Sequence, residues 1–194
     1  MVNIRALEER ILREGRVLPG EVLKVGSFLN QQIDTELLRD MSKEIARLYE
    51  NAGVTKILTI ESSGIAIAVA AGCVMGVPVV YAKKHASSNM SSDVYTSDVF
   101  SYTHQKNYKI AVAKEYLSAD DTILIVDDFL AMGNALNGLI EISHKAGAKL
   151  AGAAIEIEKG FQGGGDALRA KGFRVESLAI IDSMSDTSLT FREQ

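Results

Sequence analysis

The chain is poor in the residues that build disulfides and zinc sites: its 194 residues include one cysteine, three histidines and no tryptophan. The single cysteine, Cys73, cannot form an internal disulfide, so nothing requires an oxidising compartment, and its apolar surroundings predict a core position. The histidines lack ligand spacing and no Cys-x-x-Cys pair occurs, which disfavours a zinc site. No stretch reaches the roughly 18 uninterrupted apolar residues of a membrane span. We therefore expect a cytoplasmic protein without a membrane partner.

A strong excess of charge of one sign is also absent. The chain has 21 Lys and Arg against 25 Asp and Glu, which leaves a formal net charge of −4 at pH 7. Because nucleic-acid-binding domains usually present a basic face, this balance argues against general nucleic-acid binding. The hydrophobic fraction of 47% is ordinary for a globular protein, and the length suits a single domain over residues 1–194.

Two kinds of apolar pattern alternate along the chain. Short continuous apolar runs predict buried strands over 56–60, 77–82, 109–113, 122–126, 150–157 and 175–181, with 94–102 as a hairpin partner. Helical spacing predicts helices over 1–14, 65–75 and 134–146, and a further helix that begins after an N-cap at Asp34 and ends before Gly53. Residues 17–30 are predicted to connect the first two helices. This alternation is typical of an α/β fold with a mostly parallel central sheet and helices on both faces.

The most informative segment covers residues 123–135. Four apolar residues predict a buried strand, Asp127 and Asp128 follow directly, and a loop of small residues then leads into a helix. Carboxylates at the C-terminal edge of a parallel strand can accept hydrogen bonds from ribose hydroxyls, and the loop and helix N-terminus can hold a phosphate. The segment therefore predicts a sugar-phosphate site, although the acids could be a polar strand end and the loop an ordinary connection.

Other polar groups are expected at the same edge of the sheet. The segment Glu61-Ser62-Ser63-Gly64 lies between a strand and a helix, where backbone N–H groups can face an anion; a turn that caps the helix is the alternative. Lys83 and Lys84 close the next strand, where they could balance a diphosphate or simply be solvated. Phe129 can stack on a flat base or belong to the core.

Residues 123–135 resemble the phosphoribosyl-diphosphate signature of the type I phosphoribosyltransferases, in which two acids stand between a hydrophobic strand and a short glycine-containing loop. The resemblance implies the fold of that family, Mg²⁺ bound through the substrate, and a homodimer. It places Asp127 and Asp128 on the ribose, the 61–64 segment with Lys83 on the diphosphate, and the loop on the 5-phosphate. That loop consists of Ala131, Met132, Gly133, Asn134 and Ala135. The family often has Thr or Asn where Met132 stands, so backbone N–H groups would carry more of the phosphate binding here.

Residues 23–34 resemble the base-recognition hood of the bacterial members that act on xanthine, and the resemblance continues through 59–66, 127–131 and 157–159. It implies that residues 1–36 contribute to a hood, that Leu23 and Asn30 contact the base, and that Lys159 helps to hold it. Leu23 and Asn30 could instead be a buried anchor and a helix cap, and Lys159 a rim lysine paired with Glu158.

Residues 86–93 are polar and aperiodic, which predicts a mobile segment or a lid. Ser101-Tyr102 resembles the Ser-Tyr pair in the catalytic loop of the family. A lid would keep water away from an activated ribosyl cation, whereas a plain surface hairpin is the alternative.

The expected reaction is the purine-salvage transfer of the 5-phosphoribosyl group from 5-phospho-α-D-ribose 1-diphosphate to xanthine, which gives xanthosine 5′-monophosphate and diphosphate. Relatives that use hypoxanthine or guanine usually carry an aspartate where this chain has Ala131. Xanthine loses a proton more readily than hypoxanthine, so we hypothesise that this acid is dispensable. Two alternatives stay open: the same transfer to guanine, hypoxanthine, adenine or orotate, and a non-enzymatic regulator that senses phosphoribosyl diphosphate. Such regulators carry an added DNA-binding domain, for which the segment before the first predicted core strand is too short and too acidic.

Overall fold

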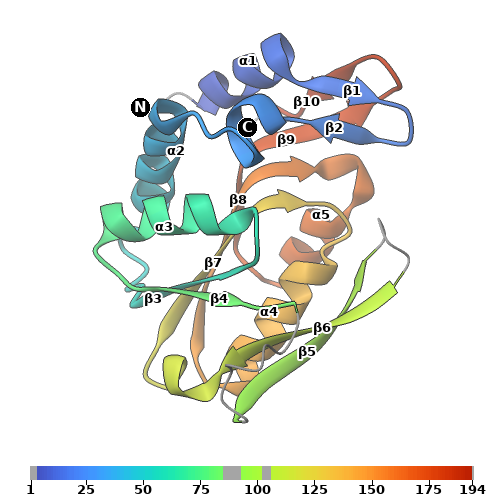
Figure 1. Cartoon of the computed structure of the whole chain (residues 1–194). Coiled ribbons are helices and arrows are strands. Elements are labelled where there is room, and N and C mark those ends of the chain that lie inside the picture. Colours follow the sequence, from blue (N-terminus) through green and yellow to red (C-terminus); the bar gives the residue numbers. More distant parts are fainter. Residues whose placement is uncertain (1–3, 85–92, 102–105, 194) are drawn as a thin grey trace.

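A six-stranded sheet forms the centre of the molecule. The computed structural model describes residues 4–84, 93–101 and 106–193 (Figure 1). In the order β10-β9-β8-β7-β3-β4, the strands are β10 (Leu189–Phe191), β9 (Val175–Met184), β8 (Lys149–Lys159), β7 (Thr122–Leu130), β3 (Lys56–Ile60) and β4 (Val79–Ala82). All neighbours are parallel except β9 and β10. The predicted mostly parallel sheet is confirmed, whereas β10 was not predicted.

Helices cover both faces of this sheet, as predicted. One face packs against α1 (Ile4–Glu14), α2 (Thr35–Leu48) and α3 (Gly64–Met75). The other face packs against α4 (Asn134–Lys145) and the antiparallel hairpin of β5 (Val94–Ser101) and β6 (Lys106–Ala113). The predicted strand 109–113 therefore lies outside the central sheet, which it meets through a single bridge between Lys83 and Ala111.

Local sequence signals set the limits of several elements. The Asp34 side chain accepts hydrogen bonds from the backbone N–H groups of Glu36 and Leu37, at 3.0 and 3.1 Å, which confirms the predicted N-cap of α2. The expectation that Cys73 is a core residue is wrong: α3 is apolar around its whole circumference, and this residue lies on its exposed side. None of the helices in the described ranges is long and apolar enough to cross a membrane.

The segment predicted as a simple connection has a structure of its own. It contains a hairpin of β1 (Arg16–Leu18) and β2 (Val22–Lys24), joined by Pro19-Gly20-Glu21, and a π-helical turn over Gly26–Asn30. These elements lie with α1 at the top of Figure 1, above the carboxyl ends of the central strands. An ion pair of 2.8 Å between Arg10 and Asp34 ties α1 to the start of α2.

Two short turns complete the described chain. One 3-10 turn, Lys114–Tyr116, follows β6, and another, Gly160–Gln162, follows β8. The second leads into α5 (Gly164–Ala170), which the sequence did not predict because its first turn is rich in glycine, a poor helix former.

Candidate active site

Two cavities adjoin at the carboxyl ends of the central strands. The larger one, of about 590 Å³, is lined by residues 129–136 after the acid pair, by Lys159, and by the β1–β2 turn. The smaller one, of about 120 Å³, is lined by the 61–64 segment, Lys84 and the acid pair itself. Tyr108 and Ala135 belong to both walls, so the two cavities form one continuous site.

The acid pair lies inside β7, and two further residues of the strand follow it. Asp127 is 6% exposed, and one of its carboxylate oxygens accepts the backbone N–H of Asp128 at 3.0 Å. Burial, and next the charge of Asp128, raise the pKa of Asp127 well above its usual value. Burial also raises the pKa of Asp128, and the neighbouring Asp127 side chain and Phe129 backbone partly offset this rise. Two acids held this way attract a cation or hydroxyl donors.

A third acid, missed by the sequence reasoning, joins this pair. Glu156 lies on β8 next to β7, is 3% exposed, and faces Asp127 and Asp128 closely enough for their charges to matter. Burial first, and then the charges of both aspartates, raise the pKa of Glu156 well above its usual value. The available signal was a glutamate in an otherwise apolar strand, which is rare without a reason.

The 61–64 segment forms a tight turn against the acid pair. The Glu61–Ser62 peptide bond is cis, and the Glu61 carboxylate accepts the backbone N–H of Lys84. A Cβ at Gly64 would stand 2.6 Å from an Asp127 carboxylate oxygen, so only glycine allows this approach. The neighbouring Thr59 hydroxyl is buried and has no hydrogen-bond partner among the described residues.

Of the two lysines that follow β4, Lys84 lines the smaller cavity. Its charge lowers the pKa of Asp127 somewhat, and its ammonium nitrogen lies 5.8 Å from the Tyr108 ring centre. Lys83 instead makes two backbone hydrogen bonds to Ala111 and is not among the residues that line the described cavities.

The loop after β7 turns sharply into α4. Gly133 has a left-handed backbone with φ of 84°, and its carbonyl accepts both the backbone N–H and the side-chain amide of Asn137, each at 2.8 Å. The Asn134 side chain donates to the Phe100 carbonyl at 3.1 Å, which joins the loop to the end of β5. Met132 is 44% exposed. The first N–H groups of a helix lack intrahelical partners, so this end of α4 can hold an anion.

The predicted base-binding residues fall into two groups. Lys159 and Phe129 line the larger cavity. The Lys159 ammonium donates to the Glu21 carbonyl at 2.6 Å, and burial lowers the pKa of this lysine. Leu23 is buried in the core, and Asn30 is exposed and lies near enough to Asp128 to influence its pKa. The predicted 86–93 lid and Tyr102 lie outside the described residues, apart from Asp93.

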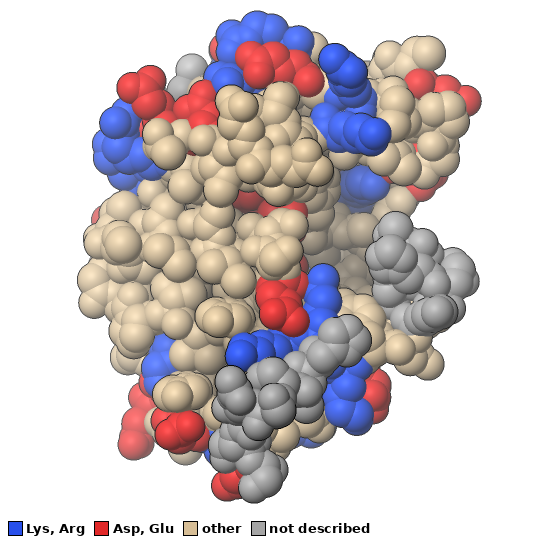
Figure 2. Space-filling model, in the orientation of Figure 1, with Lys and Arg blue, Asp and Glu red and all other residues tan. Residues whose placement is uncertain are grey.

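Figure 2 shows this face of the molecule. Acidic and basic side chains meet in a hollow between its upper and lower parts, whereas the surface over α3 on the left is largely uncharged. Val69, Cys73 and Val74 of α3 are exposed. The hollow therefore combines anion-binding backbone, oxygen ligands and lysines, a set that suits a phosphorylated sugar.

Comparisons with known proteins agree with this geometry. The profile of the phosphoribosyl transferase domain family matches residues 25–187. A xanthine phosphoribosyltransferase of Lactiplantibacillus plantarum is 53% identical over 191 residues, which cover 98% of each chain. One of Ruminiclostridium cellulolyticum is 54% identical over 96% of this chain and 98% of its own.

Solved structures share the fold. The APRTase of Giardia lamblia, complexed with 9-deazaadenine, superposes with a TM-score of 0.77 at 24% identity, over 92% of this chain and 98% of its own. The adenine phosphoribosyltransferase of Rhodothermus marinus superposes with a TM-score of 0.75 at 20% identity, over 92% of this chain and 100% of its own.

Proposed function

This chain belongs to the phosphoribosyltransferase family, and we propose on that premise that it transfers the 5-phosphoribosyl group of 5-phospho-α-D-ribose 1-diphosphate to xanthine. The products are xanthosine 5′-monophosphate and diphosphate, and the reaction salvages a purine base. The observation that carries the proposal is the identity of 50–54% with relatives named xanthine phosphoribosyltransferases, over 96–98% of the chain.

The two adjoining cavities suggest how the sugar substrate lies. We assign the ribose hydroxyls to Asp127 and Asp128, and the 5-phosphate to the 131–135 loop at the start of α4. The diphosphate is assigned to the turn of Glu61, Ser62, Ser63 and Gly64 and to Lys83. Lys84, which lines the smaller cavity, joins this set because a cation there can offset the negative charge of the departing diphosphate.

The base is assigned to the larger cavity, beneath the hood of residues 1–36. Lys159 donates to a backbone carbonyl of the hood in the structure, and an oxo group of xanthine can take the place of that acceptor. Phe129 offers a ring on which the purine can stack. Asn30 and Leu23 complete the proposed base-binding set: Asn30 lies near Asp128, and Leu23 anchors the hood from the core.

Displacement at the anomeric carbon passes through an oxocarbenium-like state, so this chain acts by positioning and by electrostatic stabilisation rather than through a covalent nucleophile. Proteins of this family generally use Mg²⁺ with the sugar diphosphate. The donor set fits such an ion, because Asp127 and Asp128 offer carboxylate oxygens, which Mg²⁺ prefers. When bound to the substrate, Mg²⁺ would offset the negative charge of the diphosphate, and Asp127 and Asp128 would hold the ribose.

We further propose a cytoplasmic homodimer that binds these small molecules and no nucleic acid. The uncharged surface of α3, with Val69 at 47% and Val74 at 46% exposure, supports a self-association surface. The formal net charge of −4 supports the absence of a nucleic-acid partner.

Initial rates with xanthine, guanine, hypoxanthine and adenine test the proposed reaction, at fixed phosphoribosyl diphosphate and Mg²⁺. We expect the highest kcat/KM with xanthine. Turnover of adenine without turnover of xanthine would refute the assignments of Lys159 and of the hood. Absence of turnover with every base, together with tight salt-dependent nucleic-acid binding, would favour a regulator instead.

A further inference from the structure

The short helix α5 packs directly against the loop assigned to the 5-phosphate. A Cβ at Gly164, the first residue of α5, would stand 2.2 Å from the Ala131 carbonyl oxygen, 2.6 Å from the Met132 carbonyl carbon and 2.7 Å from the Gly133 nitrogen. All three atoms are backbone atoms, which cannot move aside as a flexible side chain can. At Gly164 the two segments therefore approach each other main chain to main chain.

The contact is seen from the loop as well. A Cβ at Gly133 would meet the Gly164 Cα at 3.7 Å and a methyl group of Leu168 at 3.6 Å. Leu168 is 1% exposed and belongs to the core on the α4 side of the sheet. The loop thus rests on one turn of α5, with a glycine and a buried leucine beneath it.

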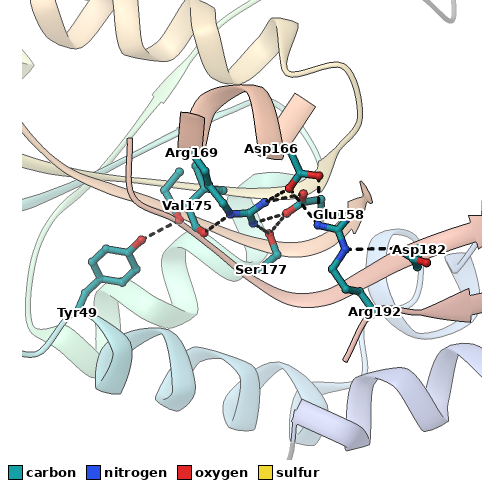
Figure 3. Close-up of polar contacts among 9 residues, drawn as sticks. Tyr49, Glu158, Asp166, Arg169, Val175, Ser177, Asp182 and Arg192 are labelled. Atoms are coloured by element: carbon teal, nitrogen blue, oxygen red, sulfur yellow. Dashed lines mark hydrogen bonds and ion pairs between the residues drawn. The ribbon is translucent and has the colours of Figure 1, made fainter. Parts of the chain in front are cut away.

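A buried ion pair fixes α5 in place (Figure 3). Arg169 donates to both carboxylate oxygens of Glu158, at 2.9 and 2.6 Å, and to the Val175 carbonyl at 3.0 Å. Ser177 donates a further hydrogen bond to the same carboxylate, and Glu158 is fully buried. Glu158 immediately precedes Lys159, so the residue that anchors α5 also fixes the strand end from which the base-binding lysine projects.

We propose that Gly164 is a positioning residue for the sugar-phosphate loop, and that α5 acts as a brace between this loop and the strand end that carries Lys159. The inference rests on the proposed function, because it takes the 131–135 loop as the site of the 5-phosphate. The brace sets the distance between the phosphate and base subsites through packed main chain rather than through contact with substrate.

The geometry gives the expected effect of Gly164→Ala. The new Cβ needs about 3.4 Å from the Ala131 carbonyl oxygen for an ordinary contact, so the loop must retreat by about 1 Å. A misplacement of about 1 Å can cost about 100-fold in rate. The loss should fall on phosphoribosyl diphosphate, whose 5-phosphate the loop holds, and not on xanthine.

The test compares KM for both substrates and kcat in the wild type, in Gly164→Ala and in Gly163→Asn. Gly163 is the matched control, because it precedes Gly164, a Cβ there meets no atom within 4 Å, and asparagine tolerates its φ of 76°. We expect KM for phosphoribosyl diphosphate to rise at least 10-fold in Gly164→Ala, with KM for xanthine within twofold of wild type. Gly163→Asn should stay within twofold for both substrates. An unchanged KM for phosphoribosyl diphosphate in a folded Gly164→Ala variant would overturn the proposal.

A second variant and a binding measurement keep the outcome decisive. If Gly164→Ala lacks a cooperative melting transition, the proposal is tested with Leu168→Val instead, because this substitution shortens the side chain beneath Gly133. We expect KM for phosphoribosyl diphosphate to rise about 3-fold in Leu168→Val. An unchanged KM would refute the proposal that α5 acts as a brace. Calorimetric titration with phosphoribosyl diphosphate and Mg²⁺ separates this inference from the proposed function. If the wild type binds phosphoribosyl diphosphate but does not convert xanthine, the proposed reaction is refuted. The affinity of the variants for phosphoribosyl diphosphate still tests whether α5 acts as a brace.

Discussion

Arg169→Met gives the sharpest stability prediction, because it removes the only cationic partner that the described structure gives to Glu158. The carboxylate is fully buried, accepts two hydrogen bonds from Arg169, and would keep only the Ser177 hydroxyl (Figure 3). Methionine keeps most of the apolar stem of arginine, so the substitution tests the charge rather than the packing.

The size of the effect follows from the buried carboxylate that is left without a cationic partner. The loss of one partner of a buried ion pair costs about 3–5 kcal/mol. The lost bond to the Val175 carbonyl adds about 1 kcal/mol. Since 29% of the Arg169 side chain is exposed, water can partly replace it.

We therefore expect Arg169→Met to lower the free energy of unfolding by about 3–4 kcal/mol, which urea unfolding measures. The double variant Glu158→Gln/Arg169→Met also removes the buried charge, so it should be more stable than Arg169→Met alone. Arg192→Met is the control: its partners Asp166 and Asp182 are half exposed, so it should cost less than about 1 kcal/mol. A loss for Arg169→Met no larger than that for Arg192→Met would refute the reasoning.

Three further predictions concern the site and its support. Glu156→Gln should become increasingly more stable than the wild type as pH rises from about 4 to 8. The reason is that folding raises the pKa of Glu156, so the wild type loses free energy of unfolding as pH rises through that range. Urea midpoints of the two proteins that change in parallel with pH would contradict this prediction. Lys159→Gln should raise KM for xanthine about 10-fold or more, through loss of a charged hydrogen bond, and leave KM for phosphoribosyl diphosphate within twofold. Tyr49→Phe should cost about 1–2 kcal/mol in thermal or urea unfolding, because the buried Ala153 carbonyl loses its 2.8 Å bond, with turnover unchanged.

The sequence was most informative where chemistry is local. The apolar run before Asp127 predicted β7, because continuous apolar residues suit a strand covered on both faces. Asp34 predicted the start of α2 because its carboxylate bonds to N–H groups two and three residues ahead. The order of strand, acid pair and small-residue loop predicted the sheet edge at which the cavities lie.

Features that depend on contacts between distant segments were missed. The α5 helix begins with glycines that disfavour helices in isolation, and it exists because Arg169 and Leu168 tie it to the sheet. Glu156 joins the acid pair only through the register of β7 against β8, which no local pattern reveals. The difference between Lys83 and Lys84 is of the same kind, since pairing with β6 decides which lysine faces the cavity.

The rate of xanthosine 5′-monophosphate formation by Asp128→Asn, beside the wild type, tests the central claim most directly. The substitution removes one carboxylate assigned to the ribose but introduces no bulk. It also relieves a buried charge next to Asp127 and Glu156, so the melting temperature should not fall. At saturating xanthine and Mg²⁺, we expect kcat/KM for phosphoribosyl diphosphate to drop about 100-fold or more. A folded Asp128→Asn variant that forms the nucleotide at the wild-type rate would contradict the account.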